Sequence, residues 1–112
     1  MQTIAVYGSL KRGKFNHPIL ADNATFLGET TLTGTLYRVS SYPALLDEGS
    51  NKYVAEVYNV PDDIADSIHR MEIGAGYKMV EEDTEYGEAI VYYADGYLAE
   101  RCRDTLEAIP TY

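Results

Sequence analysis

Two places in the 112-residue sequence combine residue types that could do chemistry. The first is the stretch AVYGSLKRG (residues 5–13), where an apolar run stops at Gly8 and Ser9 and turns basic at Lys11 and Arg12. A glycine and a small hydroxyl residue after a buried strand let the backbone turn with little side-chain bulk, so successive N–H groups can bind an anion. Such a turn suits a small carboxylate or phosphate, but Gly-Ser after a strand is most often an ordinary turn.

The second place is Glu72. Ile64, Ile68 and Glu72 are spaced four residues apart, so on a helix this carboxylate lies at the border of the apolar stripe, beside Met71. It also lies at the helix's C-terminal end, where the dipole disfavours negative charge. Partial burial and the dipole would both raise its pKa, as a general base near neutral pH requires. The alternative is a surface glutamate that extends into water.

Other side chains are weaker candidates for catalysis. Glu56 lies in an alternating strand pattern and could face inward, which makes it the reserve carboxylate. His69 is expected to face solvent, and His17 to support the loop after the Gly-Ser turn. Cys102 is expected to be a core residue rather than a nucleophile. Ser9 has no base near it in sequence, so we expect it to form hydrogen bonds rather than to attack.

The motifs of metal and cofactor sites are absent from the sequence. The single cysteine forms neither a disulfide framework nor a thiolate metal site, and the two histidines lack an HExxH-type spacing. The GxxxxGK[ST] pattern of a P-loop is also missing. We therefore expect no metal and no cofactor, and we interpret the two candidate features as proton-transfer chemistry on a small anionic substrate.

Composition and charge indicate a small globular protein. Hydrophobic residues make up 46% of the chain and charged residues 24%, which is too apolar for a disordered tail. Eighteen acidic against nine basic residues give a net charge of -9, which repels nucleic acid and anionic lipid. No apolar run reaches the roughly 18 residues of a membrane span, and no signal-peptide pattern is present. We expect a single domain over residues 1–112, a cytoplasmic location, and no nucleic-acid or membrane partner.

Alternating and β-branched patterns predict a strand-rich chain. The expected strands span residues 3–7, 25–39 and 52–60, and a hairpin over residues 77–96 turns near residues 85–87. Gly28 and Gly34 are expected to mark bends or bulges. Pro, Gly, Ser and Asn in residues 40–51 predict a loop or turn. The eleven tyrosines fit half-buried strands, the alternative being a tyrosine-lined ligand pocket.

Helical patterns appear late in the chain. The clearest helix starts with Pro61 at its first position and stops at Gly74 or Gly76. A closing helix is predicted over residues 97–109, and one or two helical turns over residues 14–22. Because strands and helices do not alternate along the chain, the order favours an α+β or barrel-like fold over a doubly wound parallel sheet.

These residues resemble a known family. The run VYGSLKRGKFNH (residues 6–17) resembles the N-terminal signature of the γ-glutamylamine cyclotransferase-like proteins, within the γ-glutamyl cyclotransferase superfamily. Looser matches follow in the family's order at FLGE (26–29), SYPALL (41–46), AEVYNV (55–60) and IHRMEIGAGYKMV (68–80). The resemblance covers most of the chain, although Ile68 and His69 stand where the family has Leu-Asp.

The resemblance implies a small mixed β-barrel with flanking helices. It implies a cofactor-free enzyme of transferase or lyase type that converts a small γ-glutamyl amine or amide to 5-oxoproline and a free amine. The site residues it implies are Glu72 as the catalytic acid/base, with Tyr7, Gly8, Ser9, Leu10 and Tyr77 in substrate binding. The alternative is a non-catalytic domain that binds a small carboxylate or γ-glutamyl ligand.

Overall fold

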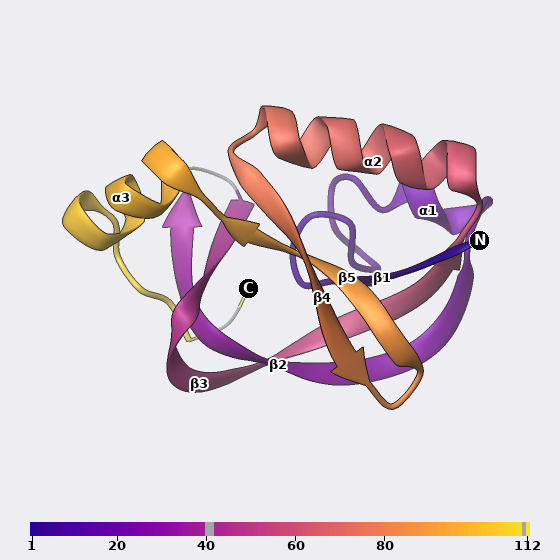
Figure 1. Ribbon diagram of the computed structural model, residues 1–112, viewed down its shortest axis with the longest axis horizontal. Helices are drawn as coiled ribbons and strands as arrows, with labels where there is room; N and C mark the ends of the chain where they lie inside the picture. Colours follow the sequence, from indigo (N-terminus) through magenta and orange to yellow (C-terminus); the bar gives the residue numbers. More distant parts are fainter. Residues whose placement is uncertain (40–41, 111) are drawn as a thin grey trace.

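The structure is a computed structural model that describes residues 1–39, 42–110 and 112, and its strands form one mixed sheet (Figure 1). The strand order is β2 (Thr25–Val39), β3 (Tyr42–Val60), β1 (Gln2–Val6), β5 (Gly87–Ala94) and β4 (Tyr77–Thr84). β1 runs antiparallel to β3 and parallel to β5, and the other pairs are antiparallel. With the helices described below, this sheet confirms the α+β class.

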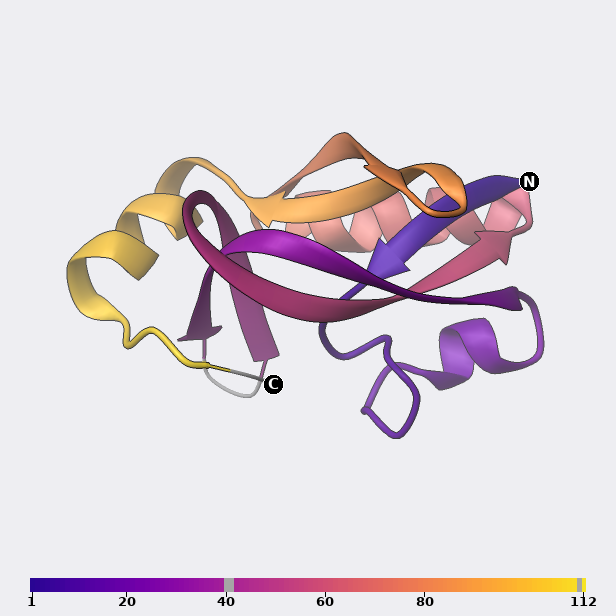
Figure 2. The same ribbon diagram turned by 90° about the horizontal axis from the view of Figure 1, so that it is seen from below.

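The sheet is curved but open. Figure 2 shows the long β2–β3 hairpin curving across the molecule, with the β4–β5 strands above it in this view. Its ladder shifts register between Phe26 and Gly28 and again between Gly34 and Thr35, so both predicted bulge glycines are confirmed. Within the described residues no ladder joins the edge strands β2 and β4. The curvature is therefore barrel-like, but the strands do not close into a barrel.

Residues 42–50 form part of β3, not the loop that their Pro, Gly and Ser predicted. Thr35 pairs with Leu46 whereas Gly34 pairs with Asn51, so four residues of β3 bulge out between two neighbouring residues of β2. A side chain on Gly34 would collide with the carbonyl oxygen of Leu46, so the bulge requires glycine there. The turn-forming residues thus mark a bulge in a long strand. Ser40 and Ser41, part of the same prediction, lie outside the described residues.

Three helices accompany the sheet in the described chain: α1 (Pro18–Ala21), α2 (Asp62–Gly74) and α3 (Gly96–Thr105). Figure 1 shows α2 lying along the sheet and α3 beyond the end of the β2–β3 hairpin. Pro61 is the N-cap of α2 rather than its first helical residue. The left-handed stop is Gly76 (φ +104°), where a Cβ would lie 3.1 Å from Leu98 Cβ. None of these helices is long and apolar enough to cross a membrane.

α3 ends four residues earlier than predicted, because the chain exchanges helical hydrogen bonds for strand-like ones. Leu106 is already extended (φ −101°, ψ 159°). Ile109 N–H donates to Leu36 O (2.8 Å), and Arg38 N–H donates to Glu107 O (3.2 Å), which ties this segment to β2. The expected core position of Cys102 is confirmed, since its side chain is fully buried.

The core forms on both faces of the sheet. Along β1, Ile4 and Val6 pack with the residues that α2 buries, whereas Ala5 and Tyr7 pack into a second cluster with β2 and β3. The end of β1 therefore lies where the two clusters meet. The chain leaves the strand there, close to the C-terminal turn of α2.

Candidate functional site

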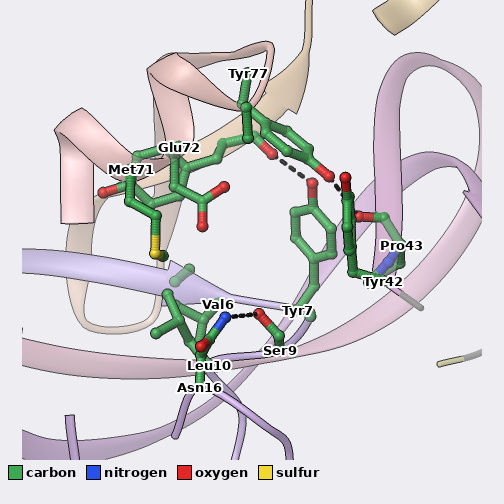
Figure 3. Close-up of a pocket in the computed structure, with 14 residues that line it drawn as sticks. Val6, Tyr7, Ser9, Leu10, Asn16, Tyr42, Pro43, Met71, Glu72 and Tyr77 are labelled. Carbon is green, nitrogen blue, oxygen red and sulfur yellow. Dashed lines mark hydrogen bonds between the residues drawn. The ribbon is translucent and has the colours of Figure 1, made fainter. Parts of the chain in front are cut away.

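A pocket of about 180 Å³ opens where β1 ends, between the start of β3 and the last turn of α2 (Figure 3). Its walls come from six segments and comprise Ala5, Val6, Tyr7, Gly8, Ser9, Leu10, Asn16, Tyr42, Pro43, Met71, Glu72, Ala75, Tyr77 and Tyr92. The pocket thus brings together all six predicted site residues. Lys11 and Arg12, the cations that follow the turn, do not line it.

The turn after β1 is held by its carbonyl groups. Gly8 O accepts from Lys11 N–H (3.0 Å), and Ser9 O accepts from Asn16 N–H (2.8 Å). In the part of the chain that the structure describes, no hydrogen bond has the N–H of Gly8, Ser9 or Leu10 as its donor. A Cβ on Gly8 would lie 3.1 Å from the Pro43 ring, so glycine lets the turn pass close to this ring. The turn therefore offers unpaired N–H groups beside the pocket, as an anion site requires.

Glu72 extends from the last turn of α2 into this pocket, with its carboxylate directed toward the turn (Figure 3). The side chain is half-buried and has no hydrogen-bond or ion-pair partner among the described residues. In that part of the chain, every fully buried side-chain oxygen or nitrogen has a hydrogen-bond partner. Because the oxygens of Glu72 have none, they must be accessible from the pocket. Burial raises the pKa of Glu72 to about 7. The direction of this shift is the one expected from partial burial.

The tyrosine hydroxyls around Glu72 already use their hydrogens. Tyr7 OH donates to Tyr92 O (2.5 Å) and accepts from Leu45 N–H (3.2 Å), and Tyr77 OH donates to Pro43 O (2.8 Å). A phenol carries one hydrogen, so neither of these groups can also donate to a ligand. Burial raises the pKa of both phenols further above 10, which keeps them neutral. Their rings form part of the pocket wall. Tyrosines therefore line the pocket, and tyrosines also lie in the strands, as the composition had led us to expect.

Ser9 and His17 act as the sequence predicted. Ser9 Oγ accepts a hydrogen bond from Asn16 Nδ2 (2.9 Å), and no histidine contacts it in the described chain. His17 Nδ1 lies 2.9 Å from Leu10 O, and since a carbonyl only accepts, this nitrogen carries the proton. Both contacts fix the segment that follows β1. They support the turn and do not form a nucleophile–base pair.

The expectation that Glu56 faces inward is confirmed, but it does not line the pocket. Glu56 is 6% exposed and accepts from Arg12 N–H (2.8 Å) and from Tyr58 OH (2.9 Å). Burial acts to raise the pKa of Glu56, but the hydrogen bonds from Arg12 and Tyr58 together hold it below its usual value. The hydrogen-bonding capacity of this carboxylate is therefore used within the fold, by Arg12 and Tyr58.

His69 is not solvent-facing, as its helix position had suggested. It is half-buried, and its ring nitrogens lie 2.6 Å from Tyr92 Oη and 2.7 Å from Gln2 Oε1. The prediction was wrong because a helical wheel shows only the helix, whereas the long Tyr92 side chain reaches over from β5. The side chain lies behind the pocket rather than in it.

Sequence reasoning missed the rest of the pocket wall. Tyr42 and Pro43 were assigned to a loop, and Asn16 and Tyr92 carried no signal of their own. The tyrosine-rich composition could have pointed to an aromatic wall, but not to which tyrosines form it. Their placement depends on pairings between strands, such as that of β1 with β5, which joins residues far apart in sequence.

Comparisons with known proteins show the family and the fold of this chain. Residues 4–111 match the family described as gamma-glutamyl cyclotransferase, AIG2-like. The protein PH0828 of Pyrococcus horikoshii, provisionally named a gamma-glutamylcyclotransferase, is 38% identical over 89 residues, which are 80% of this chain and 75% of that protein. Its crystal structure has a TM-score of 0.76 and 35% identity, over 88% of this chain and 81% of its own.

Two further solved structures share the fold over almost the whole chain. An AIG2-like protein from Mus musculus covers 100% of this chain and 88% of its own, with 25% identity and a TM-score of 0.80. The Escherichia coli protein YtfP covers 98% of this chain and 93% of its own, with 26% identity and a TM-score of 0.72. The likeness therefore extends through every element that lines the pocket.

Proposed function

Because the chain belongs to the AIG2-like gamma-glutamyl cyclotransferase family, we propose that it is a cofactor-free enzyme that converts a small γ-glutamyl amine or amide to 5-oxoproline and a free amine. The observation that carries the proposal is the environment of Glu72. Its unpaired carboxylate, with a pKa of about 7, faces a turn whose Gly8, Ser9 and Leu10 N–H groups are free in the described chain. A base and an anion site on opposite walls of one small pocket suit a substrate with adjacent ammonium and carboxylate groups.

The turn would bind the substrate's α-carboxylate. Amide N–H groups that donate to a carboxylate make charge-assisted hydrogen bonds, which are about twice as strong as neutral ones. The rings of Tyr7 and Tyr77 would pack against the substrate's methylene groups. With the carboxylate held at the turn, the α-ammonium on the neighbouring carbon would point toward Glu72.

The reaction would then be an intramolecular acyl transfer. Glu72 takes one proton from the α-ammonium, and the freed amine attacks the substrate's δ-carbonyl carbon to close a five-membered ring. As the bond from that carbon to the leaving nitrogen breaks, Glu72 gives this proton to the leaving nitrogen. The ring nitrogen then loses its second proton to the same carboxylate, which passes it to the released amine, so that the products are 5-oxoproline and an ammonium ion. Holding the folded conformer supplies much of the rate gain, because attack within one molecule needs no further association. A pKa of about 7 lets the same group act as base and then as acid near neutral pH.

The direct test is 5-oxoproline release from a panel of γ-glutamyl compounds by the wild type and by Glu72→Gln. Loss of the general acid/base should lower kcat by about 10²- to 10⁴-fold, with an unchanged circular dichroism spectrum. Glu100→Gln, a matched change on the exposed face of α3, should retain full activity. Near-normal turnover in Glu72→Gln would show that Glu72 is not the general acid/base. Calorimetric binding of γ-glutamyl ligands by a wild type that releases no 5-oxoproline would instead favour the non-catalytic alternative.

A further inference from the structure

Behind the pocket, His69 of α2 is hydrogen-bonded to two strands at once. Its Nδ1 lies 2.6 Å from Tyr92 Oη on β5, and its Nε2 lies 2.7 Å from Gln2 Oε1 on β1. An amide oxygen only accepts, so Nε2 carries the imidazole proton and Nδ1 accepts the Tyr92 hydroxyl hydrogen. Gln2 is oriented by its own amide nitrogen, which donates to Asp62 Oδ1 at 3.5 Å. The directions of these hydrogen bonds are therefore mutually consistent.

Tyr92 connects this histidine to the opposite side of the site. Its side chain donates to His69, while its main-chain carbonyl accepts from Tyr7 OH (2.5 Å). Tyr7 directly precedes the Gly8–Leu10 turn, and its hydroxyl is fixed further by Leu45 N–H (3.2 Å). One residue thus contacts both the helix that carries Glu72 and the strand end that carries the turn.

The position of His69 on α2 makes this contact relevant to Glu72. The two residues are three apart, so their side chains lie one turn apart on the same helix face. Among the described residues, Asp62, at the far end of the helix, makes the other polar contacts between α2 side chains and the start of the chain, a hydrogen bond from Gln2 on β1 and an ion pair with the N-terminal ammonium of Met1. Near Glu72, polar contact between α2 and the sheet therefore depends on His69.

We propose that Tyr92 and His69 are positioning residues that set the separation between Glu72 and the Gly8–Leu10 turn. The proposal rests on the proposed function. In that reaction the turn fixes one end of the substrate and Glu72 exchanges a proton with the neighbouring nitrogen. A displacement of about 1 Å can cost about 10²-fold in rate, so a helix that is free to shift would retain binding but lose turnover.

The test compares Tyr92→Phe with Tyr53→Phe. Tyr92→Phe removes the hydroxyl but keeps the ring that lines the pocket. Tyr53→Phe removes another buried hydroxyl, which accepts from Leu36 N–H (3.1 Å) outside the pocket. We expect kcat to fall about tenfold or more in Tyr92→Phe, with KM within about twofold of wild type, while Tyr53→Phe lowers Tm without changing kcat. Equal losses of Tm with wild-type kcat in both variants would overturn the proposal.

Histidine variants separate positioning from general packing. His69→Ala should reproduce the loss of kcat, and combining it with Tyr92→Phe should add little, because both changes remove the same contact. His69→Asn places an amide oxygen near the position of Nδ1 and should restore most of the activity. Additive losses, or no rescue by asparagine in a folded variant, would contradict the proposal.

A readout without turnover keeps this test distinct from that of the proposed function. Glu72 is surrounded by three neutral phenols, Tyr7, Tyr77 and Tyr92. An NMR titration of the Glu72 carboxyl carbon should show its pKa near 7 in wild type and Tyr53→Phe, and lower in Tyr92→Phe, where a looser helix admits water. If wild type releases no 5-oxoproline, the proposed function fails, while this titration still tests whether Tyr92 and His69 position Glu72. An unchanged titration in Tyr92→Phe would overturn that positioning role.

Discussion

Glu56 and Glu72, the two carboxylates that the sequence offers as candidate bases, lie in opposite environments. Glu56 is 6% exposed and accepts hydrogen bonds from Arg12 N–H and Tyr58 OH. Glu72 is half-buried and has no such partner in the described part of the chain. Hydrogen bonds hold the pKa of Glu56 below its usual value against the effect of burial, whereas burial raises that of Glu72 to about 7.

The difference teaches that burial alone does not decide what a carboxylate does. Burial acts to raise the pKa of both groups, and only the donors around Glu56 reverse its effect. A carboxylate whose oxygens are satisfied stabilises the fold, whereas one left unpaired in an accessible pocket can exchange a proton near neutral pH. Glu56 is therefore the structural carboxylate, and Glu72 is the one that we assign to chemistry.

The largest effect on stability is expected at Glu56. Glu56→Ala leaves the Tyr58 hydroxyl and the Arg12 N–H without their acceptor, which should lower the free energy of unfolding by about 3 kcal/mol. Urea denaturation at pH 7 measures it. Glu56→Gln keeps one acceptor oxygen and should cost about half as much. A cost below about 1 kcal/mol for Glu56→Ala would show that the hydrogen bonds of Glu56 do not stabilise the fold.

The contrast between these carboxylates was only half visible in the sequence. The spacing of Ile64, Ile68 and Glu72 predicted a partly buried carboxylate, because a helical period depends only on residues of the same helix. The alternating strand pattern likewise predicted an inward Glu56. What each carboxylate contacts was not predictable, since Arg12 reaches Glu56 across 44 positions of sequence.

The same limit explains the errors in the fold. Residues 42–50 carry turn-forming residues, yet the ladder with β2 continues on both sides of a bulge. Residues 106–109 have helical spacing, yet hydrogen bonds to Leu36 and Arg38 draw them into an extended form. In both places a partner strand supplied hydrogen bonds that local propensity could not anticipate. Elements with self-contained signals, such as α2 and the β4–β5 hairpin, were predicted correctly.

A smaller effect, of opposite sign, is expected when Glu72 is neutralised. Its folded pKa of about 7 exceeds the usual 4.5, so between these values the native state binds more protons than the unfolded state. Wild-type stability attributable to Glu72 is then present at low pH and lost as pH rises through about 7. Glu72→Gln should match wild type near pH 4 and exceed it at pH 8 by about 2 kcal/mol, less than the full pKa conversion because the side chain is only half-buried.

Thermal or urea unfolding of both proteins from pH 4 to pH 8 measures this difference. Glu56 provides the internal control, because its lowered pKa predicts the reverse trend, a contribution present above about pH 4.5 and lost as pH falls. A Glu72→Gln variant less stable than wild type at pH 8 would mean that Glu72 has stabilising partners. The assignment of the two carboxylates to different roles would then fail.

The smallest effect is expected from Arg12→Ala, which separates the two donors that Arg12 gives to Glu56. The main-chain N–H, 2.8 Å from Glu56 Oε1, survives the substitution. The half-exposed guanidinium is lost, and with it the ion pair to Oε2 (3.5 Å) and the contact with the Phe26 ring (4.1 Å). The unfolding free energy should fall by less than about 1 kcal/mol, since exposed ion pairs contribute little. A loss as large as that of Glu56→Ala would mean that the ion pair, not the backbone, satisfies Glu56.

The same variant tests whether the positive charges after the turn contribute to substrate binding. Arg12 does not line the pocket, so KM for a γ-glutamyl substrate should stay within about twofold of wild type if the N–H groups of Gly8, Ser9 and Leu10 bind the α-carboxylate. Lys11, the other cation directly after the turn, does not line the pocket either, so Lys11→Ala should also leave KM within about twofold of wild type. A tenfold rise in KM in either variant would assign carboxylate binding to the cations, because loss of one charge should hardly change a site built from amides.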